Sequence, residues 1–226
     1  MKNPVKITLI TIGLLFLGYL LIWNFNLLKF YNIPTSANEP GIKLNTVILT
    51  SNLKNYQNGD FVCYKYNDEL LGEHIRVHRL IGRSKDTIEI RKGVLFLNNK
   101  NYDENLELKH YYLLKNKEYR RLYVEKIINE GDLAFQIKND QTLVSLLDKK
   151  AKQNKLGTKI YLKSKEDINE NISKTYKQDW NEDNFGPLII PEGKCFVIGD
   201  NRHYSEDSRY IGLINELDII STVLFK

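Results

Sequence analysis

Residues 185–212 read FGPLIIPEGKCFVIGDNRHYSEDSRYIG, a short apolar run followed by a dense cluster of charges. The β-branched and aromatic residues at 195–198 are typical of a buried strand, and the Gly-Asp-Asn at 199–201 is typical of a sharp turn. Arg202 and Arg209 can then hold the two nearby aspartates or backbone carbonyls by paired hydrogen bonds, because the guanidinium fork matches a carboxylate. The stretch predicts a strand that ends in an arginine-stabilised charged loop.

Working outward, most of the chain reads as short β-strands bounded by Asn, Gly or Asp. The expected strands are 46–51, 60–66, 75–82, 87–90, 94–97, 188–190, 195–198 and 219–225. Strands at this spacing predict a mainly β protein with an antiparallel folded sheet or barrel. We expect this β core to comprise residues 30–99 and 184–226.

Residues 100–183 differ in character from the rest of the chain. Lys, Asn, Glu and Tyr dominate there, and two patches, KEYRRLYVEKI and TLVSLLDKKAKQ, have a helical pattern. We interpret this range as an inserted α+β subdomain.

The N-terminal segment indicates a membrane anchor. Residues 7–23 read ITLITIGLLFLGYLLIW, an uncharged run of 17 residues. That length is at the lower edge of what crosses ~30 Å of hydrocarbon as a helix. The nearest small-x-small pattern, Thr35-x-Ala37, lies too far beyond the run for a cleaved signal peptide. We therefore expect an uncleaved, single-pass transmembrane helix that contacts membrane lipid.

Basic residues predict the orientation of this helix. Lys2 and Lys6 in the tail at 1–6 favour a cytoplasmic N-terminus by the positive-inside rule. The long C-terminal part would then lie outside the cytoplasm, held at the plasma or inner membrane.

Composition excludes several other classes of protein. Hydrophobic residues make up 42% and charged residues 27%, which excludes a disordered chain, and the net charge of +5 is spread along the sequence rather than gathered into a nucleic-acid-binding stripe. The spacing of the two cysteines, Cys63 and Cys195, is not that of a metal site. We expect buried free thiols, with a single disulfide between them as the alternative, and neither metal nor cofactor.

The charged stretch resembles the G-D-N-R-x-x-S-x-D-S-R-Y-x-G box of type I signal peptidases, with the same P-E-G-x-x-F-V entry before it. In that family most of the box supports the site, and an aspartate in it can orient a base. The resemblance assigns supporting roles to five residues: Asp200, Arg202, Ser205, Asp207 and Arg209.

A second stretch, residues 75–100, resembles the family's general-base box and the hairpin that follows it. Most bacterial members have Lys as the base, whereas this chain has His78, as in the endoplasmic-reticulum and sporulation-type branch. A neutral imidazole, with an ordinary pKa near ~6.5, can accept a hydroxyl proton at neutral pH. The resemblance therefore implies that His78 is the general base.

The third stretch, IPTSANEP at 33–40, is similar to the P-[ST]-x-S-M-x-P box and is called the first box below. Here Ala37 occupies the position of the family's nucleophilic serine, and alanine cannot attack a peptide bond. Ser36 is a substitute nucleophile if the loop slips by one residue, although neighbouring residues of an extended segment point to opposite faces. Thr35 matches the hydroxyl-bearing oxyanion donor.

The resemblance implies a membrane-bound endopeptidase that removes N-terminal signal peptides from exported pre-proteins. The substrate would be an extended segment added beside a β-edge, with small residues around the scissile bond. Because of Ala37, the alternative is an inactive pseudopeptidase that binds signal peptides or a partner protein.

Overall fold

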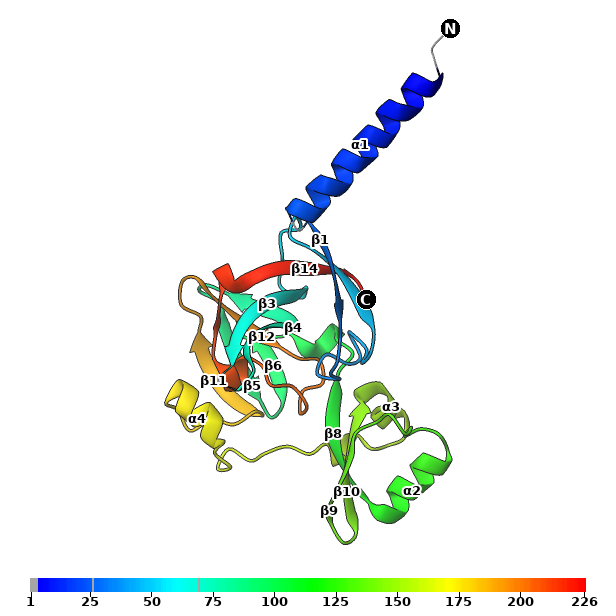
Figure 1. The fold of residues 1–226 in the computed structure, drawn as a ribbon. Helices are drawn as coiled ribbons and strands as arrows, with labels where there is room; N and C mark the ends of the chain where they lie inside the picture. The colour runs from blue at the N-terminus through cyan, green and yellow to red at the C-terminus, as the bar shows by residue number, and fades with distance from the viewer. Residues whose placement is uncertain (1–3, 26, 69) are drawn as a thin grey trace.

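A computed structural model describes residues 4–25, 27–68 and 70–226 of the chain. The N-terminal helix α1, Pro4–Asn24, projects away from the body of the protein (Figure 1). Residues 1–3 of the predicted cytoplasmic tail lie outside the described residues.

Within the part of the chain that is described, no helix combines the length and the apolar character needed to cross a membrane.

The body is built from antiparallel β-sheets, which confirms the mainly β prediction. The largest sheet has the order β1-β2-β14-β3-β4-β12-β13, and the second has the order β11-β5-β6-β7. In the first sheet β1 is Leu28–Asn32, β2 is Val47–Ser51, β14 is Ile219–Phe225, β3 is Phe61–Asp68, β4 is Gly72–Arg83, β12 is Lys194–Ile198 and β13 is Ile214–Asn215. In the second sheet β11 is Asn184–Ile189, β5 is Thr87–Arg91, β6 is Val94–Leu97 and β7 is Lys100–Asn101.

Alternation of side chains along these strands creates the core between the two sheets. Ile88 and Ile90 of β5 face Phe185 of β11 and the β12 residues Phe196 and Ile198, and all of these side chains are buried. Successive residues of a strand point to opposite faces, so one apolar set per strand is enough to fill this layer. The core fixes the positions of β4, which carries His78, and of β12, which leads into the charged loop, residues 199–209.

A third sheet, β8-β10-β9, forms a separately packed unit at the end of the molecule opposite α1 (Figure 1). Its strands are Lys109–Lys115, Gln141–Leu147 and Ala134–Lys138, and α2, Asn116–Val124, and α3, Asp148–Gln153, cover it. It has its own buried cluster, in which Leu114, Leu122 and Val144 pack together. We call this unit the insert.

The flanks of the range 100–183 pack against the β core instead. Tyr102 and Trp180 contact the core cluster, and so does Ile172 of α4, Glu170–Tyr176. Three short helices of the 3-10 type, Asp103–Asn105, Gly157–Lys159 and Glu216–Asp218, and α5, Ser208–Ile211, complete the described elements.

Candidate active site

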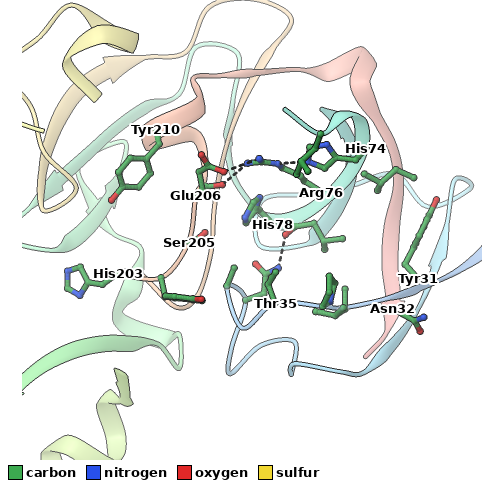
Figure 2. Close-up of a pocket in the computed structure, with 18 of the residues that line it drawn as sticks. Tyr31, Asn32, Thr35, His74, Arg76, His78, His203, Ser205, Glu206 and Tyr210 are labelled. Carbon is green, nitrogen blue, oxygen red and sulfur yellow. Dashed lines mark hydrogen bonds and ion pairs between the residues drawn. The ribbon is translucent and has the colours of Figure 1, made fainter. Parts of the chain in front are cut away.

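A pocket of about 760 Å³ lies between three segments that are distant in sequence. Residues 31–35, 37 and 38 form one side, residues 74–78 of β4 form another, and residues 203–206 of the charged loop close it. Figure 2 shows Thr35, His78 and Ser205 around the same space. The fold therefore brings the three stretches singled out in the sequence to one site.

His78 is buried in β4 with one ring nitrogen bonded and the other open. Its Nδ1 atom lies 2.9 Å from the hydroxyl oxygen of Tyr64, which comes from the neighbouring strand β3. Its Nε2 atom makes no hydrogen bond with the described residues, and it is not fully buried. It is therefore open to the pocket that His78 lines.

Burial lowers the pKa of His78 from 6.5 to about 4; Asp207 opposes this effect, while Arg76 and Arg209 add to it. Desolvation disfavours the charged imidazolium, and nearby guanidinium groups repel it. His78 is consequently neutral at neutral pH, as a proton acceptor must be.

The first box lines the pocket with residues on both sides of Ser36 but not with Ser36 itself. Thr35 and Ala37 line it, whereas Ser36 is buried and is not among its lining residues. The backbone bends at Ser36 and turns at residues 37–41, so the segment is not extended here. The hydroxyl considered as a substitute nucleophile is therefore outside the pocket in this conformation, while the proposed oxyanion donor is inside it.

Backbone contacts fix the first box against both other segments. The Asn38 side chain donates to the carbonyl of Val77, at 2.7 Å, one residue before His78. The backbone N–H of Asn201 donates to the Ala37 carbonyl, at 3.0 Å, and its side chain donates to the Ser36 carbonyl, at 3.2 Å. These bonds set the position of Ala37 relative to β4, the strand that carries His78.

Gly199 is required at the start of the charged loop because the first box approaches it closely. A Cβ atom at this position would lie 2.4 Å from the Ala37 carbonyl oxygen and 2.3 Å from the Ser205 hydroxyl. Such contacts are too short for any side chain, so only glycine permits this packing.

The two aspartates of the charged loop are held by arginines. Asp207 is fully buried, accepts from Arg209 at 2.8 and 2.9 Å and accepts from the Gly199 N–H at 3.0 Å. Burial opposes its ionisation, but Arg209 keeps the pKa of Asp207 below its usual value. Asp200 is held by Arg79 of β4, at 2.7 and 2.5 Å.

Arg202 binds neither loop aspartate and instead pairs with Asp103, at 2.8 and 2.5 Å. Among the described residues no hydrogen bond joins Asp200 or Asp207 to His78, whose bonded partner is Tyr64. The geometry therefore places these carboxylates in support of the loop rather than in contact with His78. Ser205 lines the pocket, and its buried hydroxyl has no partner among the described residues.

Two pocket features were not anticipated from the sequence. Arg76 of β4 reaches Glu206 of the charged loop at 2.9 Å and stacks over Tyr66 at 4.1 Å, which ties β4 to the loop (Figure 2). Tyr64 bonds His78 across the β3–β4 hairpin. The period-2 pattern of β4 could have placed Arg76 on the same face as His78, but it gives no information about partners on other segments.

The cysteines lie away from this chemistry. Cys63 on β3 and Cys195 on β12 are buried free thiols, and burial raises the pKa of Cys63 to about 11 and that of Cys195 to about 12. In the described ranges, no group of three or more His, Cys, Asp or Glu side chains is arranged to hold a metal ion.

Comparison with known proteins shows which family the chain is similar to. A family model described as signal peptidase, peptidase S26, matches residues 2–226. The chain is 31% identical to signal peptidase IB of Staphylococcus aureus (strain Mu50) over 156 residues, which cover 69% of this chain and 68% of that protein. It is 27% identical to signal peptidase I of Aquifex aeolicus over 230 residues, which cover 94% of this chain and 78% of that protein.

A third relative, signal peptidase I P of Bacillus subtilis subsp. natto, is 34% identical over 110 residues. The match covers 48% of this chain and 52% of that protein, so the chain spans about half of that relative's length.

Proposed function

The chain belongs to the signal peptidase family, peptidase S26, and we propose that it binds the signal peptides of exported pre-proteins and removes them. The observation that carries this proposal is that Thr35, Ala37 and His78 line one pocket. An extended substrate would lie between the 31–35 segment and β4, where backbone groups of both segments can pair with it.

In the proposed reaction His78 is the general base, and the Thr35 hydroxyl stabilises the oxyanion. His78 is neutral and open to the pocket at Nε2, and Thr35 is the exposed hydroxyl of the first box. Preorganised donors of this kind are worth several kcal/mol in acyl transfer. Of the supporting residues, Asp200, Arg202, Asp207 and Arg209 hold the charged loop that carries the Asn201 contacts to the first box, and Ser205 lines the pocket.

The attacking group must come from elsewhere than Ala37. Ser36 reaches the pocket only if the first box turns by one residue, which would break the Asn201 contacts to the Ser36 and Ala37 carbonyls. A water molecule activated by His78 is the other source.

Binding without cleavage is the second candidate function, and the specific observation that favours it is the combination of Ala37 in the pocket with Ser36 outside it. A pocket of this kind would hold a signal peptide or a partner's extended segment without hydrolysing it.

Incubation of the natural protein with a pre-protein that carries a small-x-small site tests the proposal. Release of the signal peptide, read from the mass of the product, supports the peptidase. A pre-protein that is bound and left intact supports the second candidate. In an active protein, loss of cleavage on Ser36→Ala identifies Ser36 as the attacking group, and retention points to water.

We also propose that residues 7–23 anchor the protein in a membrane, with the tail at 1–6 in the cytoplasm and the body outside it. Apolar side chains on α1 are exposed, among them Leu9 at 65% and Phe16 at 61%. In the division of the chain expected from the sequence, residues 30–99 and 184–226 would carry the site, and the range 100–183 includes the insert. Resistance of the membrane-bound protein to alkaline carbonate extraction tests the anchor.

A further inference from the structure

The hydrogen bond between Tyr64 and His78 determines which nitrogen of the imidazole carries the proton. A neutral imidazole has one N–H donor and one acceptor nitrogen, and the bond made by one nitrogen decides the state of the other. Here Nδ1 faces the Tyr64 hydroxyl at 2.9 Å, and Nε2 faces the pocket. The ring proton can be on Nδ1 or on Nε2. The pocket would then meet an acceptor nitrogen in the first arrangement and an N–H donor in the second.

In the first arrangement Nδ1–H donates to the Tyr64 oxygen. The Tyr64 hydroxyl would then need another acceptor for its own proton. Tyr64 is fully buried, and its hydroxyl has no second hydrogen-bond partner among the described residues. A buried hydroxyl proton without an acceptor is strongly disfavoured, because the full cost of desolvation is left uncompensated.

A carboxylate close enough to influence Tyr64 is already occupied. Asp207 influences both Tyr64 and His78 electrostatically, but its two oxygens accept from Arg209 and from the backbone N–H groups of Gly199 and Arg209. The first arrangement therefore leaves a buried donor unsatisfied.

In the second arrangement the Tyr64 hydroxyl donates to Nδ1, and the imidazole proton is on Nε2. The buried hydroxyl and Nδ1 then satisfy each other, and the N–H that remains is the one exposed to the pocket. We propose that Tyr64 holds His78 in this tautomer, so that the resting pocket presents an Nε2–H donor to a carbonyl oxygen of a bound peptide.

The burial of His78 is consistent with this state. A histidine that stays neutral down to a pKa of about 4 remains a single-donor group throughout the neutral range. To act as a base, His78 must first transfer its proton from Nε2 to Nδ1 and give up the bond from Tyr64. Tyr64 is in this sense a positioning residue, because it acts on the substrate only through His78.

The donor role towards a peptide rests on the proposed function, whereas the tautomer is a property of the free protein. The test is therefore made without substrate, by long-range ¹H–¹⁵N NMR of the His78 ring in the natural protein at neutral pH. We expect a proton on Nε2 alone and an Nδ1 signal shifted by a hydrogen bond. Tyr64→Phe removes only the hydroxyl and should shift the Nδ1 signal to that of a nitrogen without a donor.

Tyr66→Phe is the matched control, because Tyr66 is on the same strand, stacks with Arg76 and lies outside the pocket lining. It should leave the His78 signals unchanged. A proton on Nδ1 in the natural protein, or an Nδ1 signal that does not respond to Tyr64→Phe, would overturn the proposal. Absence of cleavage or of peptide binding would count against the proposed function and leave the tautomer result standing.

Discussion

Two residues that line the pocket, Ala37 and His78, determine which chemistry it can support. Ala37 offers no group that can attack a peptide bond, whereas His78 offers an imidazole that is neutral at pH 7. In our proposal the Tyr64 hydroxyl, buried beside His78, determines that the imidazole presents an N–H donor to a ligand. At the scale of single residues, the chemistry of this site depends on the unreactive methyl group of Ala37 and on the hydrogen bond between Tyr64 and His78.

The buried histidine makes stability depend on pH. In the unfolded chain His78 is protonated around pH 6.5, whereas in the folded protein protonation is delayed to about pH 4. Between these values the unfolded chain binds more protons, so the free energy of unfolding falls as the pH decreases. The shift amounts to about 3 kcal/mol, present above pH 6.5 and lost by pH 4.

Denaturant unfolding of the natural protein and of His78→Gln at pH 4 to 7 measures this contribution. We expect the variant to lose less stability than the natural protein over that interval. Equal losses in the two proteins would mean that His78 is not held neutral by burial.

At the scale of elements, the charged loop connects the two halves of the site. Arg209 and Asp207 are buried and paired at its base, and Asn201 in its turn donates to the first box. Removal of one partner of a buried ion pair leaves an uncompensated charge. The loop is therefore the element whose loss should be most damaging.

Asp207→Asn should destabilise the protein by about 3–5 kcal/mol, because Arg209 would stay buried without its counter-charge. The measurement is chemical denaturation, with Asp140→Asn as the control at an exposed aspartate. A loss below about 1 kcal/mol, which is typical of a surface substitution, would contradict the structural role.

The insert is joined to the site by a second buried cation. Lys109, at the start of β8, lies 3.0 Å from Glu39 of the first box and 3.2 Å from Asp132. The backbone of the same residue bonds Asp200 and Arg202, and Ser145 of β10 donates to Asn201. The insert thus contributes directly to the support of the first box.

Lys109→Met should lower stability by about 3 kcal/mol, because two partly buried carboxylates lose their shared cation. Lys149→Met is the matched control, since the Lys149 side chain is 67% exposed and its ion pair with Glu107 is at the surface. Similar unfolding curves for the two variants would show that the contact between the insert and the first box contributes little.

Local patterns predicted the antiparallel strands and the arginine-stabilised loop because strand alternation and turn chemistry are short-range. The partners of particular charges could not be predicted in the same way. Arg79 binds Asp200 across 121 positions, and Arg202 binds Asp103 across 99. The bond between Tyr64 and His78 likewise depends on the register of the β3–β4 hairpin, which is fixed by the packed sheet.

At the scale of the whole molecule, the β body lies between α1 and the insert (Figure 1), and the residues that line the pocket belong largely to this body. A membrane anchor at one end would bring the pocket to the place where the signal peptide of an exported protein leaves the bilayer. We expect protease added to spheroplasts to digest the body and leave a membrane-embedded fragment that contains residues 7–23. Complete protection of the body would contradict this orientation.

The central claim is that this chain has the organisation of a signal peptidase site and lacks one hydroxyl at position 37. The most direct test is Ala37→Ser, assayed with a pre-protein that carries a small-x-small site. The added hydroxyl would lie in the pocket with His78, so cleavage at that site should appear, or rise by several orders of magnitude over the natural protein, as expected when a nucleophile is restored. A folded Ala37→Ser protein that binds the pre-protein and cleaves it no faster than the natural chain would contradict the claim.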